Sequence, residues 1–114
     1  FDDDEFDVVL EKMLAADVIV LGSPVYTETM SAAARTLLER LETHPRADEL
    51  SGREFAYFIQ GYGPSRLTVE STTASVRNAV EPRGAHFLGA ASDMVELAEL
   101  RETIDAQEAE ASRE

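Results

Sequence analysis

Cysteine is absent from this chain of 114 residues. Disulfide bonds, zinc sites built on thiolates and cysteine nucleophiles are therefore excluded. The two histidines, His44 and His86, lack the close spacing of a metal-binding pair, so we expect no metal site. They stand beside a predicted helix end and a predicted strand start, which favours a capping or surface role.

Long hydrophobic runs are also lacking, and the longest apolar stretches fall well short of the ~20 residues of a membrane-spanning helix. No signal-peptide pattern opens the sequence, so we expect a cytoplasmic protein without membrane contact. Basic residues are scarce as well, with 10 Lys plus Arg against 23 Asp plus Glu and a net charge of -13. Nucleic acids and anionic membranes require a basic footprint, so neither is an expected partner.

Lysine is nearly absent, because Lys12 is the only one in the sequence. An acidic, solvated surface without a specific partner is the simplest interpretation. Many carboxylates with almost no lysine also fit a halophilic protein, since about 1 M salt shortens the Debye length to roughly 3 Å and screens their repulsion. The halophilic interpretation predicts loss of structure when salt is removed. A melting temperature that is equal in low and in molar salt would contradict it.

The segment 16–26, Ala-Asp-Val-Ile-Val-Leu-Gly-Ser-Pro-Val-Tyr, is the most informative part of the chain. Its apolar run 18–21 is too short for a helix and too uniform for a half-exposed strand. It therefore predicts a parallel strand covered on both faces. Gly22-Ser23-Pro24 is predicted to end the strand, because Pro24 cannot donate to a ladder and keeps Ser23 out of the helical region. An irregular loop then follows at the carboxyl end of the strand, where ligands bind in open α/β sheets.

The rest of the sequence alternates between helical and strand patterns in the order α-β-α-β-α-β-α. Strict alternation with short loops implies parallel strands and right-handed crossovers. We therefore expect one α/β domain over residues 1–114, a three-layer sandwich with a small parallel sheet, and a frayed acidic tail at 105–114. The expected helices cover 6–14, 34–41, 69–80 and 94–104, the expected strands 17–22, 55–59 and 86–91, and 46–52 is predicted as a polar connection.

The stretch 17–26, followed by Met30-Ser31 and Leu38-Glu39-Arg40, resembles the middle of flavodoxin-like NADPH-dependent FMN reductases. It is most similar to their iron–sulfur flavoprotein and NAD(P)H–quinone reductase branch. The family pattern is an Ala-Asp pair, a hydrophobic strand, Gly-Ser/Thr-Pro-x-Tyr and a helix that ends near Asp-Arg or Glu-Arg. The resemblance covers residues 3–95. It implies a flavodoxin-like fold, an FMN cofactor, and hydride transfer from NAD(P)H to FMN and on to a small-molecule acceptor such as a quinone.

By this resemblance, two loops form the cofactor site. The first leaves the strand at 17–22 and offers backbone N–H groups and one tyrosine face to the flavin ring. The second is rich in glycine, which lets the backbone approach a ligand closely. A plain turn is the alternative at each place, and no catalytic residue is named, because the flavin does the redox chemistry. The implied cofactor-binding residues are Ser23, Pro24, Val25, Tyr26, Thr27, Gly61, Tyr62 and Gly63.

The sequence departs from the family at its start. In the family, a first strand and a loop rich in Ser, Arg and Asn hold the FMN phosphate, and no such segment precedes residue 1. The first one or two strands of the sheet are then expected to be missing, which leaves one edge of the strand at 17–22 open to another chain. The second hypothesis is therefore a non-catalytic module that acts through dimerisation or protein interaction.

Family members are often dimers, so a homodimer or higher oligomer is expected under either hypothesis. The cysteines of the iron–sulfur branch are absent, and Arg35 is the nearest candidate for the family's basic helix residue. Hydrolysis at Ser23 is discounted because the sequence lacks the Gly-x-Ser-x-Gly elbow. A phospho-acceptor receiver domain is disfavoured because no lysine stands near the end.

Overall fold

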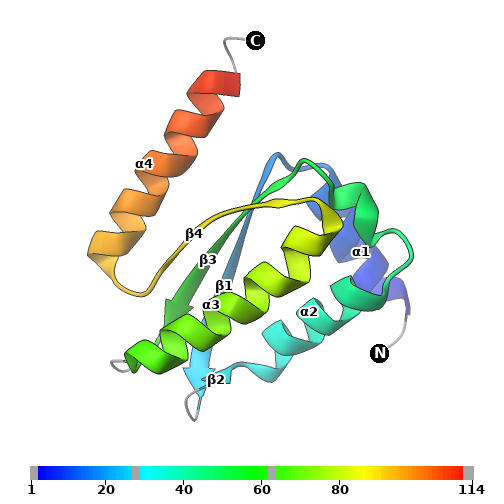
Figure 1. Ribbon diagram of the computed structural model, residues 1–114. Coiled ribbons are helices and arrows are strands. Elements are labelled where there is room, and N and C mark those ends of the chain that lie inside the picture. Colours follow the sequence, from blue (N-terminus) through cyan, green and yellow to red (C-terminus); the bar gives the residue numbers. More distant parts are fainter. Residues whose placement is uncertain (1–2, 27–28, 62–63, 112–114) are drawn as a thin grey trace.

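The computed structural model describes residues 3–26, 29–61 and 64–111. Helices and strands follow one another in the predicted order, with one additional two-residue strand and two 3-10 turns (Figure 1). Within these ranges no helix has the length and hydrophobicity that a bilayer crossing requires. The elements are α1 (Asp3–Leu14), β1 (Val18–Tyr26), β2 (Thr29–Met30), α2 (Ala32–Thr43), η1 (Ala47–Leu50), β3 (Glu54–Gln60), α3 (Arg66–Val80), η2 (Glu81–Arg83), β4 (His86–Ala91) and α4 (Met94–Ala111).

The strands form a 4-stranded sheet in the order β2-β1-β3-β4. β1 pairs with β3 in parallel over residues 18–24, and β3 pairs with β4 in parallel. β2 is antiparallel and contacts the last two residues of β1. The predicted parallel arrangement is therefore confirmed for β1, β3 and β4. The sequence does not predict β2, because two residues carry no periodic pattern.

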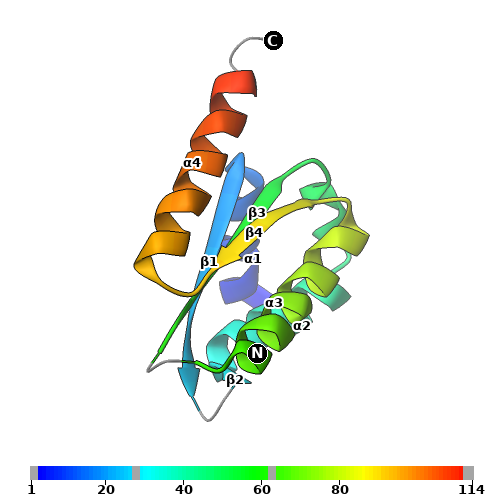
Figure 2. The same ribbon diagram turned by 60° about the vertical axis from the view of Figure 1, so that its left-hand side comes forward.

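Side chains of the strands alternate between two faces of the sheet, and different helices cover the two faces. Phe55, Tyr57 and Ile59 of β3 belong to the larger apolar cluster, which also contains residues of α1, α2 and α3. Ala56 and Phe58, which alternate with them, pack with residues of α4. Two views show the same division, with α1–α3 on one side of the sheet and α4 on the other (Figures 1 and 2). The predicted three-layer α/β architecture is confirmed.

The main core lies between the sheet and α1–α3. Its helical members recur at three- and four-residue spacing, so each of these segments buries one apolar stripe when it becomes helical. Helix caps fix where the segments begin: Ser31 accepts a hydrogen bond from Ala34 N at the start of α2, and Ser65 accepts one from Thr68 N at the start of α3. The helical core residues are Phe6, Leu10, Met13, Ala34, Leu38, Leu41, Val76, Ala79 and Val80.

β1 is longer than the sequence predicts. Gly22-Ser23-Pro24 does not end the strand but continues it in register with residues 58–60 of β3, and β1 extends to Tyr26. The expectation of an irregular loop from Pro24 onward is therefore wrong. Within the described residues, β1 has no neighbour on its other side before it meets β2, so the predicted open edge is confirmed. Proline is tolerated in sheets at such edges, because its missing N–H breaks no ladder bond there.

β1 is also not covered on both faces. Ile19 and Leu21 pack against the main core, but Val20 between them is 54% exposed. On the face of Val20, the described residues place α4, which packs chiefly against β4 at the other edge of the sheet (Figure 2). The prediction of a doubly covered strand is wrong, because an apolar run shows what a strand could bury and not which neighbours are present.

Two other segments differ in detail from expectation. The polar connection at 46–52 contains η1, whose Ala47 and Leu50 are buried. Two apolar residues among polar ones form no recognisable period, so the sequence gives no sign of this turn. The segment predicted to fray is helical, because α4 runs on to Ala111. The side chains of residues 105–110 are exposed. Fraying of this stretch stays a prediction.

Candidate functional site

The candidate site lies where β1 and β3 end. In open α/β sheets, the crevice outside the carboxyl ends of the strands is where ligands bind. Pro24 of β1 lies beside Gln60, the last residue of β3. Val25 and Tyr26 continue β1 past this point and pair with β2. The structure thus brings the first predicted loop to the place where β3 ends and the second predicted loop begins.

Gly61 packs directly against Val25. A Cβ atom on Gly61 would lie 3.3 Å from the Val25 Cβ, 3.7 Å from its carbonyl oxygen and 3.8 Å from its nitrogen. The first distance is shorter than ordinary van der Waals contact, so a side chain at this position would push the two segments apart. The two predicted binding segments therefore meet here, and a side chain at Gly61 would need Val25 to shift by a few tenths of an ångström.

Ser23 lies inside the fold and not in the crevice. It is 2% exposed, its hydroxyl donates to the Pro24 carbonyl oxygen at 2.9 Å, and its Oγ accepts a hydrogen bond from Ser31 N at 3.1 Å. The Ser23 side chain is therefore already bonded to protein groups. Its predicted role as a cofactor contact stays a prediction. The bond to Ser31 could not be foreseen, because it joins residues on two different elements.

The start of α2 is held to β2 by a second contact. Arg35 Nη2 donates to Thr29 Oγ1 at 3.2 Å, and this hydrogen bond is exposed. Arg35, the sequence's candidate for the family's basic residue, thus contacts the strand that pairs with the end of β1. Thr27, Tyr62 and Gly63 lie outside the described residues, and of Tyr26 the structure describes the backbone alone.

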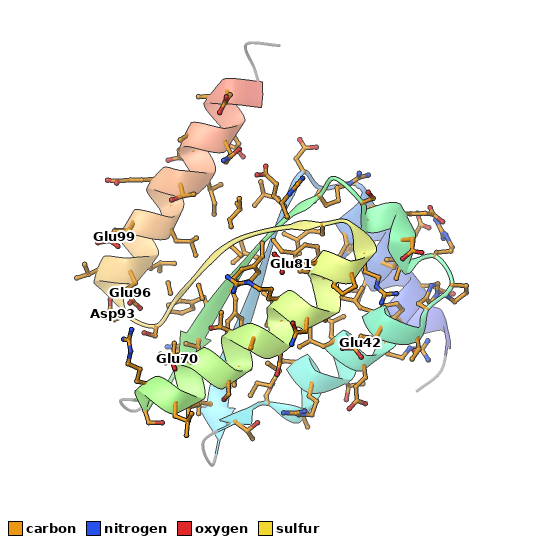
Figure 3. The ribbon with its side chains drawn as sticks, viewed as in Figure 1. Glu42, Glu70, Glu81, Asp93, Glu96 and Glu99 are labelled. Carbon is orange, nitrogen blue, oxygen red and sulfur yellow. The ribbon has the colours of Figure 1, made fainter. Side chains whose placement is uncertain are left out.

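The start of α4, at the same end of the sheet, carries its own carboxylates. Glu96 Oε1 accepts hydrogen bonds from Ser92 N at 2.8 Å and from Ser92 Oγ at 2.6 Å, and Asp93 Oδ1 accepts one from Glu96 N at 2.8 Å. Figure 3 shows Asp93 and Glu96 together at this helix start, with Glu70 of α3 nearby in the view. Asp93 therefore occupies one of the amino-terminal N–H groups of α4, and Asp93 and Glu96 place negative charge where an anion could otherwise bind.

Charged networks elsewhere lie away from the crevice and have structural explanations. Arg46 bonds Glu49 and Glu11, and the hydrogen bond from Arg46 lowers the pKa of the Glu49 carboxyl. His44 Nε2 lies 3.0 Å from an Asp7 carboxylate oxygen, beside the end of α2. Among the residues that the structure describes, no three His, Asp or Glu side chains are grouped as a metal ion would need.

Two larger cavities lie along the α4 side of the sheet. One of about 620 Å³ lies at the amino ends of β1 and β3 and is lined by Asp17, Gly52 and Glu54, among others. The other, of about 420 Å³, is an apolar groove between Val20 and the first half of α4. Neither is lined by the two predicted binding segments. Cavity size and the position expected from strand topology thus point to different places, and strand topology has the stronger physical basis for a ligand site.

Comparison with known proteins gives a consistent result. A family model described as NADPH-dependent FMN reductase matches residues 1–102. The FMN-dependent NADH:quinone oxidoreductase 2 of Pseudomonas aeruginosa is 33% identical over 85 residues, which cover 71% of this chain and 38% of that protein. The chain therefore spans well under half the length of this curated relative.

Solved structures agree in fold. A short-chain flavodoxin associated with a bacterial microcompartment superposes with a TM-score of 0.67 at 16% identity, covering 86% of this chain and 70% of the flavodoxin. An NADH:FMN oxidoreductase superposes with a TM-score of 0.61 at 14% identity, covering 91% of this chain and 58% of that structure. These likenesses confirm the predicted flavodoxin-like fold, and the family match over most of the sequence shows that the chain belongs to the NADPH-dependent FMN reductase family.

Proposed function

We propose that this chain supplies the flavin-ring site of an FMN-dependent NAD(P)H oxidoreductase. Membership of the FMN reductase family supports this, as does the Pseudomonas aeruginosa relative, an FMN-dependent NADH:quinone oxidoreductase. The observation that carries the proposal is the close approach of Gly61 to Val25 at the carboxyl ends of β1 and β3. A bound flavin would supply hydride transfer from NAD(P)H and electron transfer to a quinone or another small-molecule acceptor.

The residues at this edge suit a flat ring. Pro24, Gln60 and Gly61 are exposed and uncharged. β3 ends at Gln60, so the backbone after it leaves the ladder, and the missing side chain of Gly61 lets it pass close to Val25. Backbone groups of residues 24–26 and 61 would orient the ring and limit the access of water to it.

The residues present suit a phosphate less well. A phosphate needs basic side chains or unused N–H groups, and at the start of α4 the N–H of Glu96 is already bonded to the Asp93 carboxylate. By the family resemblance, a strand and loop ahead of β1 hold this group. Because the chain spans 38% of its Pseudomonas aeruginosa relative, the activity of a whole protein is part of the proposal.

A titration with FMN in molar salt, followed by quenching of flavin fluorescence, tests the proposal. We expect saturable binding near one FMN per chain. Gly61→Ala should weaken it by about tenfold, because the new Cβ would lie 3.3 Å from Val25 Cβ. Gly22→Ala is the matched control, since its Cβ would meet no atom closer than 4.0 Å. Equal affinities of the two variants, or no binding by a chain that circular dichroism shows to be folded, would contradict the proposal.

The open side of β1 favours a second candidate function, a module that acts through self-association. Val20 is 54% exposed beside an unpaired strand edge, and such edges pair readily with other chains. On this proposal the chain is a homodimer in solution, and Val20→Lys shifts it toward monomer. Sedimentation equilibrium measures this directly. A wild-type chain that stays monomeric at all concentrations would rule the second candidate out.

A further inference from the structure

We propose that Ser23 is a positioning residue, whose hydroxyl holds the end of β1 in the shape that receives a flavin. This inference rests on the proposed function. It concerns a residue that makes no ligand contact through its side chain and acts through the backbone of Val25. The inference rests on the hydrogen bonds that the Ser23 hydroxyl makes with Pro24 and Ser31.

The first step concerns where the Ser23 hydroxyl lies. β1 alternates its side chains, and Ser23 points to the same face as Ile19 and Leu21, which pack against the main core. The side chain is 2% exposed, so water is largely excluded from it. A polar group in such a place costs free energy unless it is bonded, and this hydroxyl both donates, to the Pro24 carbonyl, and accepts, from Ser31 N–H.

The second step concerns what the hydroxyl joins. Ser31 is the N-cap of α2, and its own Oγ accepts a hydrogen bond from Ala34 N at 3.2 Å. The chain of bonds therefore runs from the end of β1 through Ser23 and Ser31 into the first turn of α2. Residues that are eight positions apart in the sequence are fixed to each other, and α2 is fixed to the candidate site.

The third step concerns why this clamp is needed. β1 and β2 pair through two residue pairs, Val25↔Met30 and Tyr26↔Thr29. Such a short two-stranded ladder is marginal in water. The other clamp, from Arg35 to Thr29, is exposed and open to competition by water. The partly buried bond from Ser23 is better protected from water than the Arg35 contact, and it restrains the backbone at the end of β1, where Gly61 packs against Val25.

The same contacts argue against a reactive role for Ser23. A nucleophilic serine needs an adjacent base and an exposed oxygen. Here the hydroxyl proton goes to a backbone carbonyl, and the oxygen is covered. A positioning role uses both bonds that the structure shows.

Two measurements on the full chain in molar salt test the inference. Amide hydrogen exchange of the ligand-free protein reports the clamp itself. FMN titration by fluorescence quenching reports its consequence, with the visible circular dichroism of the bound flavin as a spectroscopic signature. The variants are Ser23→Ala, the hydroxyl-retaining Ser23→Thr, and Ser75→Ala as control, since the Ser75 hydroxyl bonds to its own helix in an exposed position.

We expect Ser23→Ala to speed exchange at Ser31 and Met30 by about tenfold and to leave amides 56–59 of β3 unchanged, because the clamp is lost while the sheet stays folded. Its FMN dissociation constant should rise by about tenfold, with an altered flavin signal at saturation, and Ser23→Thr should restore both in part. Ser75→Ala should resemble the wild type.

Unchanged exchange at Ser31 in Ser23→Ala would overturn the inference, and so would faster exchange with an unchanged FMN affinity and signal. A general rise in exchange, β3 included, would show that Ser23 stabilises the whole fold, which also overturns a specific positioning role. Failure of the wild type to bind FMN would refute the proposed function instead. The exchange data alone would then decide whether Ser23 holds β2 and the start of α2.

Discussion

The two faces of the sheet are built by the same strands but covered very differently. On the α1–α3 face, Phe55, Tyr57 and Ile59 of β3 are 2%, 0% and 0% exposed. On the α4 face, Val20 of β1 is 54% exposed beside an apolar groove of about 420 Å³. The closed face therefore supplies most of the core, and the open face leaves apolar surface exposed.

Because the two faces are covered so differently, substitutions on them should change the stability of the chain by different amounts. Side chains on the closed face touch several elements at once, so their loss leaves cavities. Side chains on the open face contact one helix and solvent, so their loss costs less.

The largest effect is expected on the closed face. Ile59→Ala removes a fully buried side chain from the main cluster and should lower the free energy of unfolding by about 2–5 kcal/mol. Urea unfolding, monitored by circular dichroism, measures the change. A loss below about 1 kcal/mol would mean that this face is packed no better than the other.

A smaller effect is expected where α4 meets the sheet. Leu100 is 6% exposed and packs with Ala56 and Ala91 in the minor cluster. Leu100→Ala should cost about 2 kcal/mol, at the lower end of the range for buried leucine, because the adjacent groove gives solvent access to the space that is left. Glu99→Ala on the same helix, at an exposed position, is the control and should change little. Equal losses in the two variants would show that α4 does not dock on the sheet in solution.

The Tyr57 hydroxyl provides a test by pH on the closed face. It is buried without a hydrogen bond of good geometry to the described residues, and burial raises its pKa, an effect that the nearby Thr72 hydroxyl partly offsets. The unfolded chain therefore loses this proton at a lower pH, so stability falls as pH rises beyond about 10. Tyr57→Phe should change stability at neutral pH by less than about 1 kcal/mol and should show a weaker alkaline decline. Parallel alkaline declines of the two proteins in urea titrations would contradict this assignment.

The smallest effect is expected on the open face. Val20→Ala should cost about 1 kcal/mol or less, since the side chain is already half in water. Urea unfolding at several protein concentrations measures it. A cost that approaches that of Ile59→Ala and grows with concentration would show that a second copy covers this face, in favour of the self-association candidate.

The order of elements follows from local patterns, and for that reason it could be predicted. Leu38 and Leu41 recur at helical spacing, Ser31 is a good N-cap, and Pro82 with Gly84 ends the segment after α3. Each of these signals acts within a few residues along the chain. The parallel sheet then follows from strict alternation.

What could not be predicted depends on neighbours in space. A proline ends a strand that has neighbours on both sides. Pro24 is tolerated in β1 because that edge of the sheet is open. Val20 lies in an apolar run, yet nothing in the run reveals that the helix on this face, α4, leaves the side chain 54% exposed. At the candidate site, the sequence predicts a glycine-rich loop at Gly61, whereas the contact of Gly61 with Val25 and the clamp from Ser23 to Ser31 depend on a fold that brings distant residues together.

NMR mapping of the residues that respond to FMN tests the proposed flavin site at the carboxyl ends of β1 and β3. Amide signals of the isotope-labelled protein are followed by NMR during a titration with FMN in molar salt. We expect the signals of Val25, Gly61 and Ser31 to shift, and those of Gly52 and Glu54, at the 620 Å³ cavity on the amino ends of the strands, to stay in place. Shifts confined to Gly52 and Glu54, or no shifts at all in a folded chain, would contradict a flavin site at the carboxyl ends of β1 and β3.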